Sequence, residues 1–209
     1  MLTKILICLA VGYFCGCFST GYFVGKANHI DIRAYGSGNA GATNTLRTLG
    51  VKAGAITFLG DALKAILPIL AFRMMYSDAE PLWQLYGLYT AIGVTLGHNF
   101  PFYLNFKGGK GIAVMAGAII ALTGWEATLI ALAIFAGIVY FTRYVSLGSL
   151  IIAWILPIHT ILNYRNHPAF LHMFGLCMFI TILAYVRHRE NIKRLLSGTE
   201  RKIGEKSTK

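Results

Sequence analysis

The sequence has few charged residues. Of its 209 residues only 13% are Asp, Glu, Lys or Arg, whereas 56% are hydrophobic; soluble domains carry about 25% charged and about 45–50% apolar residues. This composition excludes a disordered chain and argues against a water-soluble globular domain. Acidic residues are the scarcest charged class, eight against 19 basic ones. Because the basic residues lie between apolar runs and in the tail, they exclude a nucleic-acid-binding face and predict a membrane protein with cytoplasmic basic loops.

Disulfide and metal-ligand patterns are also missing. Cys8, Cys15 and Cys17 fall inside the first apolar run and Cys177 inside the last, so the cysteines do not form a framework. Cysteines and histidines do not cluster at the spacing of a metal site. No Ser-His-Asp order and no reactive cysteine is evident. The sequence therefore predicts no metal, no cofactor and no covalent nucleophile.

Seven apolar runs divide the chain. The first begins with Lys4, as a signal peptide would, but it is too long for one and leads into a glycine-rich loop, so we interpret it as the first span. The fourth and fifth runs are short for full spans, and are compatible with a kinked hairpin, two tilted helices or a re-entrant pair. Pro68 and Pro157 lie inside runs, where they would kink a helix. The runs comprise residues 2–24, 51–76, 82–100, 112–123, 127–141, 145–162 and 169–186.

These runs predict an all-α, polytopic integral membrane protein with about seven transmembrane helices, folded as a single domain over residues 1–209. An odd number of spans puts the two chain ends on opposite sides of the membrane. If the long first loop is cytoplasmic, most basic residues lie in the cytoplasm; the exceptions are Lys4, Arg73, Arg165 and the intramembrane Lys64. We therefore expect the amino end outside and the carboxyl end in the cytoplasm.

Two polar segments have no role in this scheme. The loop Ser77–Glu80, with its acidic pair, is expected on the outer side. The polar tail from about residue 199 is expected to be disordered.

Three polar clusters fall on the predicted cytoplasmic side. The first, residues 36–47, combines three glycines with Ser, Thr and Asn at nearly every other position and ends in Arg47. Glycine lets a backbone approach an anion closely, and an arginine binds a phosphate through two parallel hydrogen bonds. The alternative is a flexible loop between helices. The candidate ligands are Ser37, Gly38, Asn39, Thr43, Asn44 and Arg47.

The second cluster, residues 106–111, places a Gly-Gly pair between lysines directly before the fourth run. The N–H groups and dipole of a helix amino terminus favour an anion there, so Gly108, Gly109 and Lys110 form a second candidate phosphate site. It is not a nucleotide P-loop, because Leu104 and Gly111 occupy positions that need Gly and Ser or Thr. The alternative, cytoplasmic lysines around a turn, explains the charge but not the glycines.

The third cluster, residues 188–195, is a basic segment that leaves the seventh run. His188 and Asn191 are three residues apart and share a helix face, and Glu190 can pair with Arg194. A basic helix end at a membrane boundary is the alternative. Beside two other anion sites, a functional role is favoured.

Polar residues inside the runs carry weaker signals. Asp61 and Lys64, three residues apart, are expected to pair, and the sequence leaves open whether the pair is functional or structural. His98 and Asn99 are expected to orient the Gly-Gly loop. Two phosphate-type sites at one membrane surface indicate two anionic ligands, one soluble and one with an apolar chain. Transfer between them needs orientation and charge neutralisation.

The stretches GSGNAGATNTLR, GHNFPFYLNFKGGKG and HRENIKRLLSGTE resemble the bacterial acyl-phosphate-dependent glycerol-3-phosphate acyltransferase family, PlsY, over essentially the whole chain. The resemblance implies transfer of a fatty acyl group from acyl phosphate to the 1-hydroxyl of sn-glycerol 3-phosphate. The products would be lysophosphatidic acid and phosphate, in the first step of phospholipid synthesis. It also implies a multi-pass protein in the lipid bilayer of the bacterial cytoplasmic (inner) membrane, with its active site on the cytoplasmic side. No protein partner is indicated, although the enzyme that makes acyl phosphate is a candidate.

The resemblance also implies roles for residues. Its catalytic residues would be Arg47, Lys110, His188 and Asn191. Substrate phosphates would be bound by Ser37, Thr43, Asn44, Arg47 and Lys110, with Gly38, Gly108 and Gly109 supplying backbone donors and room. Either His188 or a substrate phosphate oxygen would take the hydroxyl proton.

Two alternatives are weighed against this reading. Acyltransferases that use thioester donors carry a histidine with an aspartate five residues later, and no histidine here has one. A transporter of an organic phosphate would show inverted repeats and polar residues near the membrane midplane, whereas these clusters gather at one surface.

Overall fold

A computed structural model describes residues 1–76 and 83–205, in which helices and loops are found and no strand. The loop expected on the outer side, Ser77–Glu80, lies outside the described residues. The chain divides into two compact units, residues 1–118 with 204–205 and residues 119–203. That the chain folds as a single domain stays a prediction. Apolar runs mark which segments enter a membrane but not which helices pack together, so they carry no signal for this division.

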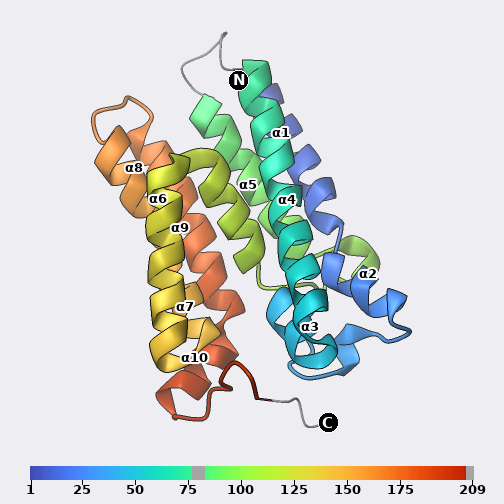
Figure 1. The fold of residues 1–209 in the computed structure, drawn as a ribbon. Helices are drawn as coiled ribbons and strands as arrows, with labels where there is room; N and C mark the ends of the chain where they lie inside the picture. Colours follow the sequence, from blue (N-terminus) through green and yellow to red (C-terminus); the bar gives the residue numbers. More distant parts are fainter. Residues whose placement is uncertain (77–82, 206–209) are drawn as a thin grey trace. The chain divides into compact units, whose positions relative to one another are not determined.

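Three long helices form the frame of the first unit: α1 (Leu2–Cys17), α4 (Val51–Tyr76) and α5 (Trp83–Asn99). Short elements gather near the end where α4 begins, as Figure 1 shows for α2 and α3. These elements are α2 (Thr20–Ala27), η1 (Ile32–Ala34), α3 (Ala42–Leu49) and η2 (Phe102–Leu104).

Glycines allow α1 and α5 to pack with their backbones in contact. Gly12 and Gly16 on α1 face Gly93 and Gly97 on α5, each pair separated by three residues. A Cβ added to Gly12 would lie 2.5 Å from the Thr90 carbonyl oxygen, and one added to any of the other three would overlap a backbone atom of the opposite helix. Small residues four apart are the usual basis of close helix pairs in membranes, where apolar burial gives no preference for another helix over lipid.

The middle of α4 buries charged residues and exposes leucines. Asp61 and Lys64 are buried, whereas Leu59, Leu63 and Leu67 are exposed. A helix of a soluble protein would show the reverse pattern. The pattern is that of a helix with a lipid-facing side, and α4 continues through Pro68.

The helix α6 (Ile112–Thr142) is two helices joined at Gly124. Gly124 has φ 81°, a left-handed conformation that favours glycine. Figure 1 shows the ribbon reversing direction within α6. The fourth and fifth runs are therefore joined by a reversal of the chain, which a hairpin and a re-entrant pair share.

The second unit continues with α7 (Val145–Ile152), α8 (Ile155–Tyr164), α9 (Phe170–Arg187) and α10 (Arg189–Leu196). The sixth run is broken between α7 and α8, just before Pro157. A proline lacks the N–H that would bond the carbonyl four residues earlier, and that carbonyl, on Ala153, instead accepts a 2.8 Å hydrogen bond from the Thr181 hydroxyl of α9. The expected kink at Pro157 is therefore a break stabilised by the neighbouring helix.

Each apolar run contains a helix. Within the described ranges, five helical segments are long and apolar enough to cross a membrane. The third run, α5, has 17 residues, and the fourth and fifth runs are the two arms of α6. The five segments are Leu2–Ala27, Val51–Tyr76, Ile112–Thr142, Val145–Tyr164 and Phe170–Arg187.

Candidate functional site

Asn44 organises the loop of the first cluster. Its side-chain oxygen accepts a 2.8 Å hydrogen bond from the Ser37 backbone N–H, and its amide nitrogen donates to the Ile32 and Tyr35 carbonyls, both at 3.0 Å. Asn44 is 2% exposed. Its polar atoms are thus committed to the loop itself, which makes Asn44 a support of the site where the sequence had suggested a substrate ligand.

The helix α3 carries the charged end of this cluster. It begins after Gly41, and Thr43 and Arg47 lie one turn apart on it, so their side chains share a face. The turn before it is tight, with Gly36 at φ 59° and Gly38 at φ 69°. Ser37 is exposed in this turn. Ser37, Thr43 and Arg47 therefore remain the candidates for direct contact with a phosphate.

Asn39 connects the first two clusters. Its side-chain oxygen accepts a 3.0 Å bond from the Gly41 N–H, and its amide nitrogen donates to the Gly108 carbonyl at 3.4 Å. A second link joins the same loops, since the Arg33 guanidinium donates to the Leu104 carbonyl at 3.4 Å. Two segments some 70 residues apart in the chain therefore meet within the first unit.

The Gly-Gly pair has a different role from the one expected. The Gly108 N–H donates to the Asn99 carbonyl at 3.1 Å, and the Gly109 N–H donates to the His98 carbonyl at 3.0 Å. Neither N–H is therefore positioned to bind a substrate phosphate, which corrects the expectation that both glycines supply backbone donors. Their lack of side chains does matter, because a Cβ on Gly108 would overlap the His98 carbonyl and one on Gly109 would overlap the His98 ring.

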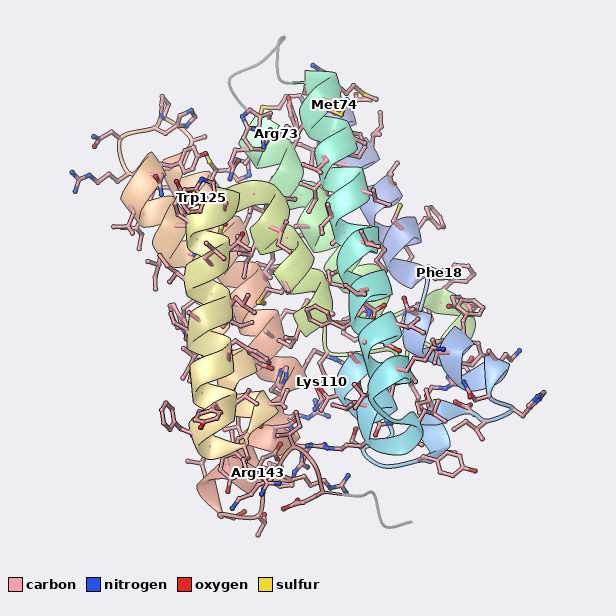
Figure 2. All side chains as sticks on the ribbon, in the orientation of Figure 1. Phe18, Arg73, Met74, Lys110, Trp125 and Arg143 are labelled. Atoms are coloured by element: carbon pink, nitrogen blue, oxygen red, sulfur yellow. The ribbon has the colours of Figure 1, made fainter. Side chains whose placement is uncertain are left out.

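Lys110 lies where this loop enters α6. Gly111 has φ 86°, and α6 begins with the next residue. The first N–H groups of a helix have no partner inside it, so the start of α6 combines amide donors with the half-buried Lys110 ammonium. Figure 2 shows Lys110 near the end of the first unit opposite to Arg73 and Met74. Lys110 and the start of α6 therefore lie at one end of this unit.

Beneath the Gly-Gly loop lies a buried polar network. Lys64 Nζ lies 2.8 Å from Asp61 Oδ1 and 2.9 Å from His98 Nδ1. The Thr20 hydroxyl donates to Asp61 Oδ1 at 3.0 Å. The expected pairing of Asp61 with Lys64 is present, and His98 contacts the Gly-Gly loop as predicted.

The third cluster lies in the second unit. His188 separates α9 from α10, and its Nδ1 lies 2.8 Å from the Ala184 carbonyl oxygen. A carbonyl only accepts, so Nδ1 carries the proton and a neutral His188 has its lone pair on Nε2. His188 can therefore accept a proton at Nε2.

Glu200 is a residue of this cluster that sequence reasoning missed. It is 7% exposed, and its Oε1 accepts hydrogen bonds from Asn191 at 2.7 Å and Ser146 at 2.8 Å, while its Oε2 accepts from Arg194 at 2.8 Å. Burial raises the pKa of Glu200, but these three donors outweigh burial and leave the pKa below its ordinary value. The signal in the sequence was an acidic residue within a basic tail.

The chain beyond Glu200 is also fixed by hydrogen bonds. The Arg143 guanidinium donates to the Ile203 carbonyl at 2.8 Å, and the Ile203 N–H donates to the Arg143 carbonyl at 2.8 Å. Figure 2 shows Arg143 and Trp125 at opposite ends of the second arm of α6. The tail was expected to be disordered from about residue 199, whereas residues 199–203 pack against the second unit.

The side chains of the three clusters are of the kinds that bind anions and transfer protons. Cations and helix-start amides surround the first two clusters, and the third supplies an imidazole and an amide. In residues 1–76 and 83–205, no group of three or more His, Cys, Asp or Glu could hold a metal ion.

Comparison with known proteins places these features in a family. A family model described as glycerol-3-phosphate acyltransferase matches residues 6–198. Glycerol-3-phosphate acyltransferases of Alkaliphilus metalliredigens (strain QYMF) and Clostridioides difficile (strain 630) are each 45% identical to this chain. The first alignment covers 97% of this chain and 98% of the relative, and the second covers 96% of both.

Two crystal structures of PlsY (YgiH), described as an integral membrane glycerol 3-phosphate acyltransferase, share this fold. The glycerol 3-phosphate form has a TM-score of 0.83 at 32% identity and covers 96% of both chains. The lysophosphatidic acid form has a TM-score of 0.80 at 31% identity, covering 96% of this chain and 95% of that one.

The fold and these likenesses define an integral membrane acyltransferase of phospholipid synthesis. The chain belongs to the glycerol-3-phosphate acyltransferase family. The predictions of an all-α membrane fold, of an enzyme and of this family are confirmed, and the transporter alternative is set aside.

Proposed function

We propose that this enzyme transfers a fatty acyl group from an acyl phosphate to the 1-hydroxyl of sn-glycerol 3-phosphate. The observation that carries the proposal is the hydrogen bond between Asn39 and Gly108, which joins two anion-binding loops in one unit. Arg47 of the first loop and the half-buried Lys110 of the second are the cations that bind the phosphates. Both substrates carry a phosphate, so two adjacent phosphate sites suit this pair of reactants.

The reaction needs no acyl-enzyme. The hydroxyl oxygen attacks the carbonyl carbon of the acyl phosphate, a new ester C–O bond forms, and the C–O bond to the phosphate breaks. Phosphate leaves with its electron pair, and the hydroxyl proton passes to His188 Nε2 or to a substrate phosphate oxygen. The products are lysophosphatidic acid and inorganic phosphate. Because acyl phosphate is a mixed anhydride with a good leaving group, orientation and charge neutralisation supply the catalysis.

The residues divide by role. Arg47 and Lys110 neutralise phosphate charge, with Ser37 and Thr43 as hydroxyl ligands. Gly38 leaves room for the substrates, Gly108 and Gly109 allow their loop to pack against His98, and Asn39 and Asn44 hold the first loop. By the family resemblance His188 and Asn191, in the second unit, act in the same reaction, and Glu200 accepts a hydrogen bond from Asn191.

The positive charges support a location. With the amino end outside, nearly all basic loops and the three clusters face the cytoplasm. We therefore place the enzyme in the bacterial cytoplasmic (inner) membrane with its site on the cytoplasmic side. The enzyme that makes acyl phosphate is the candidate protein partner.

Steady-state kinetics of two lysine variants tests the site. Lys110→Ala should lower kcat/KM by about 10²–10³, the usual loss for one electrostatic contact to a reacting group. Lys107→Ala is the matched control, because Lys107 is an exposed cation of the same loop, and it should stay within about threefold of wild type. Equal activity of the two variants would remove Lys110 from the site.

A further inference from the structure

Three ionisable residues are buried together in the first unit, and the transfer reaction uses none of them. The exposed fractions of their side chains are 6% for Lys64, 1% for Asp61 and 2% for His98. Ionisable groups inside a membrane protein are costly and usually serve function. Their arrangement indicates which function.

Lys64 determines the tautomer of His98. An ammonium has three donors and no acceptor, and Lys64 Nζ lies 2.6 Å from the Phe18 carbonyl, 2.8 Å from Asp61 Oδ1 and 2.9 Å from His98 Nδ1. All three partners must therefore accept. His98 Nδ1 then has no proton, and the proton of the neutral ring is on Nε2.

The other side of the His98 ring faces the loop before α6. A Cβ on Gly109 would overlap His98 Nε2, so the ring tip lies directly against the Gly109 backbone. The His98 carbonyl also accepts the Gly109 N–H at 3.0 Å. His98 therefore holds this loop through both its main chain and its imidazole.

The geometry points to Lys64 and Asp61 as positioning residues for the Gly108–Lys110 loop, acting through His98. Lys64 fixes which ring nitrogen carries the proton, and Asp61, held by Thr20, balances the Lys64 charge. The oriented Nε2–H side of the ring sets the path of Gly109 and thereby the place of Lys110. This inference rests on the proposed phosphate-binding role of that loop.

Two substitutions of His98 separate the two sides of the ring. In His98→Gln the side-chain nitrogen can take the place of Nε2, whereas in His98→Asn the amide reaches only the place of Nδ1. We expect His98→Gln to keep KM for both substrates within about threefold of wild type. His98→Asn should raise KM for at least one of them about tenfold, because its side chain no longer reaches Gly109. Equal KM values in the two variants, or the higher value in His98→Gln, would overturn the inference.

Removing the Asp61–Lys64 ion pair tests whether these two residues position the Gly108–Lys110 loop through His98. The double variant Asp61→Asn/Lys64→Met leaves no unbalanced buried charge, and so avoids the large penalty of a single substitution. This double variant should raise KM about tenfold, as His98→Asn is expected to do. Added to His98→Gln it should raise KM no further, because an amide donor has no tautomer to be set. A lower thermal unfolding temperature with unchanged KM would instead show a purely structural pair and contradict the inference.

Two further variants complete the experiment. Lys52→Met, an exposed lysine on the same helix, should leave KM and the unfolding temperature unchanged. If Lys110→Ala is inactive while the double variant has normal KM, the positioning role fails and the proposed site stands. If Lys110→Ala is fully active, the proposed site itself fails.

Discussion

At the scale of single residues, two asparagines of similar sequence context have different tasks. Asn39 bonds to both loops of the site, whereas Asn44 bonds only to the backbone of its own loop. Composition identified both as polar groups of an anion site. It could not show that the Asn44 amide is satisfied internally, because that depends on where the Ile32 and Tyr35 carbonyls lie in space.

Asn44→Asp tests this internal role with almost no change in shape. The new carboxylate can still accept the Ser37 N–H, but it would face the Ile32 and Tyr35 carbonyls without a donor. We expect destabilisation of the loop by about 2–3 kcal/mol and a large loss of kcat. The measurement is the thermal unfolding temperature together with activity. Wild-type values of both would contradict the role, and Asn28→Asp, on the exposed end of α2, is the control.

Glu200 makes stability of the carboxyl-terminal segment dependent on pH. Its pKa is lower in the folded protein than in the unfolded chain, so the carboxylate stabilises the fold above the unfolded value of about 4.3. This contribution is lost as pH falls through the folded pKa. Hydrogen exchange at the Ile203 amide, corrected for intrinsic rate, should therefore accelerate as the pH falls below the unfolded value and through the folded pKa.

Two glutamate variants check the cause. Glu200→Gln should show the faster exchange already at neutral pH and should reduce turnover, since Asn191 loses its carboxylate partner. Glu190→Gln, whose carboxylate is exposed and faces Arg189 and Lys193, should leave both unchanged. Unaltered exchange in Glu200→Gln would contradict the proposal that Glu200 holds the carboxyl-terminal segment in place.

At the scale of elements, the spacing of glycines in the sequence indicates which helices pair closely. The sequence indicates only some of the points at which helices break. Gly12 and Gly16 on α1, like Gly93 and Gly97 on α5, are four apart, a signal for close pairing. The break before Pro157 follows from its missing N–H. The hairpin at Gly124 is harder to predict, because one glycine in an apolar run can equally continue a helix.

The α1–α5 pair gives a prediction on folding. Gly16→Leu and Gly93→Leu should each prevent close approach and lower the unfolding temperature steeply or abolish accumulation of the protein, since the added atoms would meet backbone. Gly175→Leu on α9 is the control, as nothing lies within 4 Å of its added Cβ. Normal stability of Gly16→Leu would contradict the packing described here.

At the scale of the whole molecule, hydropathy and charge predict that the chain enters a membrane. They carry no information on which helices pack together. The apolar runs predicted the membrane class and the position of every helix in them, because the bilayer imposes length and composition on a span. The two units depend on which helices pack together, and the order of the tail depends on the burial of Glu200. Neither is expressed in local composition.

Membrane orientation is predicted from charge alone and can be mapped directly. In a variant without the four native cysteines, single cysteines at Lys52 and Lys107 should react with a membrane-impermeant thiol reagent only from the cytoplasmic side. A cysteine at Arg165, in the loop after α8, should react only from the outside. Labelling of positions 52 and 107 from outside would reverse the proposed orientation.

A comparison of acyl donors tests the central claim that two phosphate sites serve two phosphate substrates. The purified protein, in lipid or detergent, is given labelled glycerol 3-phosphate with either an acyl phosphate or an acyl thioester, and labelled lysophosphatidic acid is measured. We predict product from the acyl phosphate alone, because only that donor carries a phosphate directly on the acyl carbonyl, where the second loop is proposed to bind it. Equal or better yield from the thioester would contradict the donor assignment, and absence of product with both donors from folded protein would contradict the account of the site.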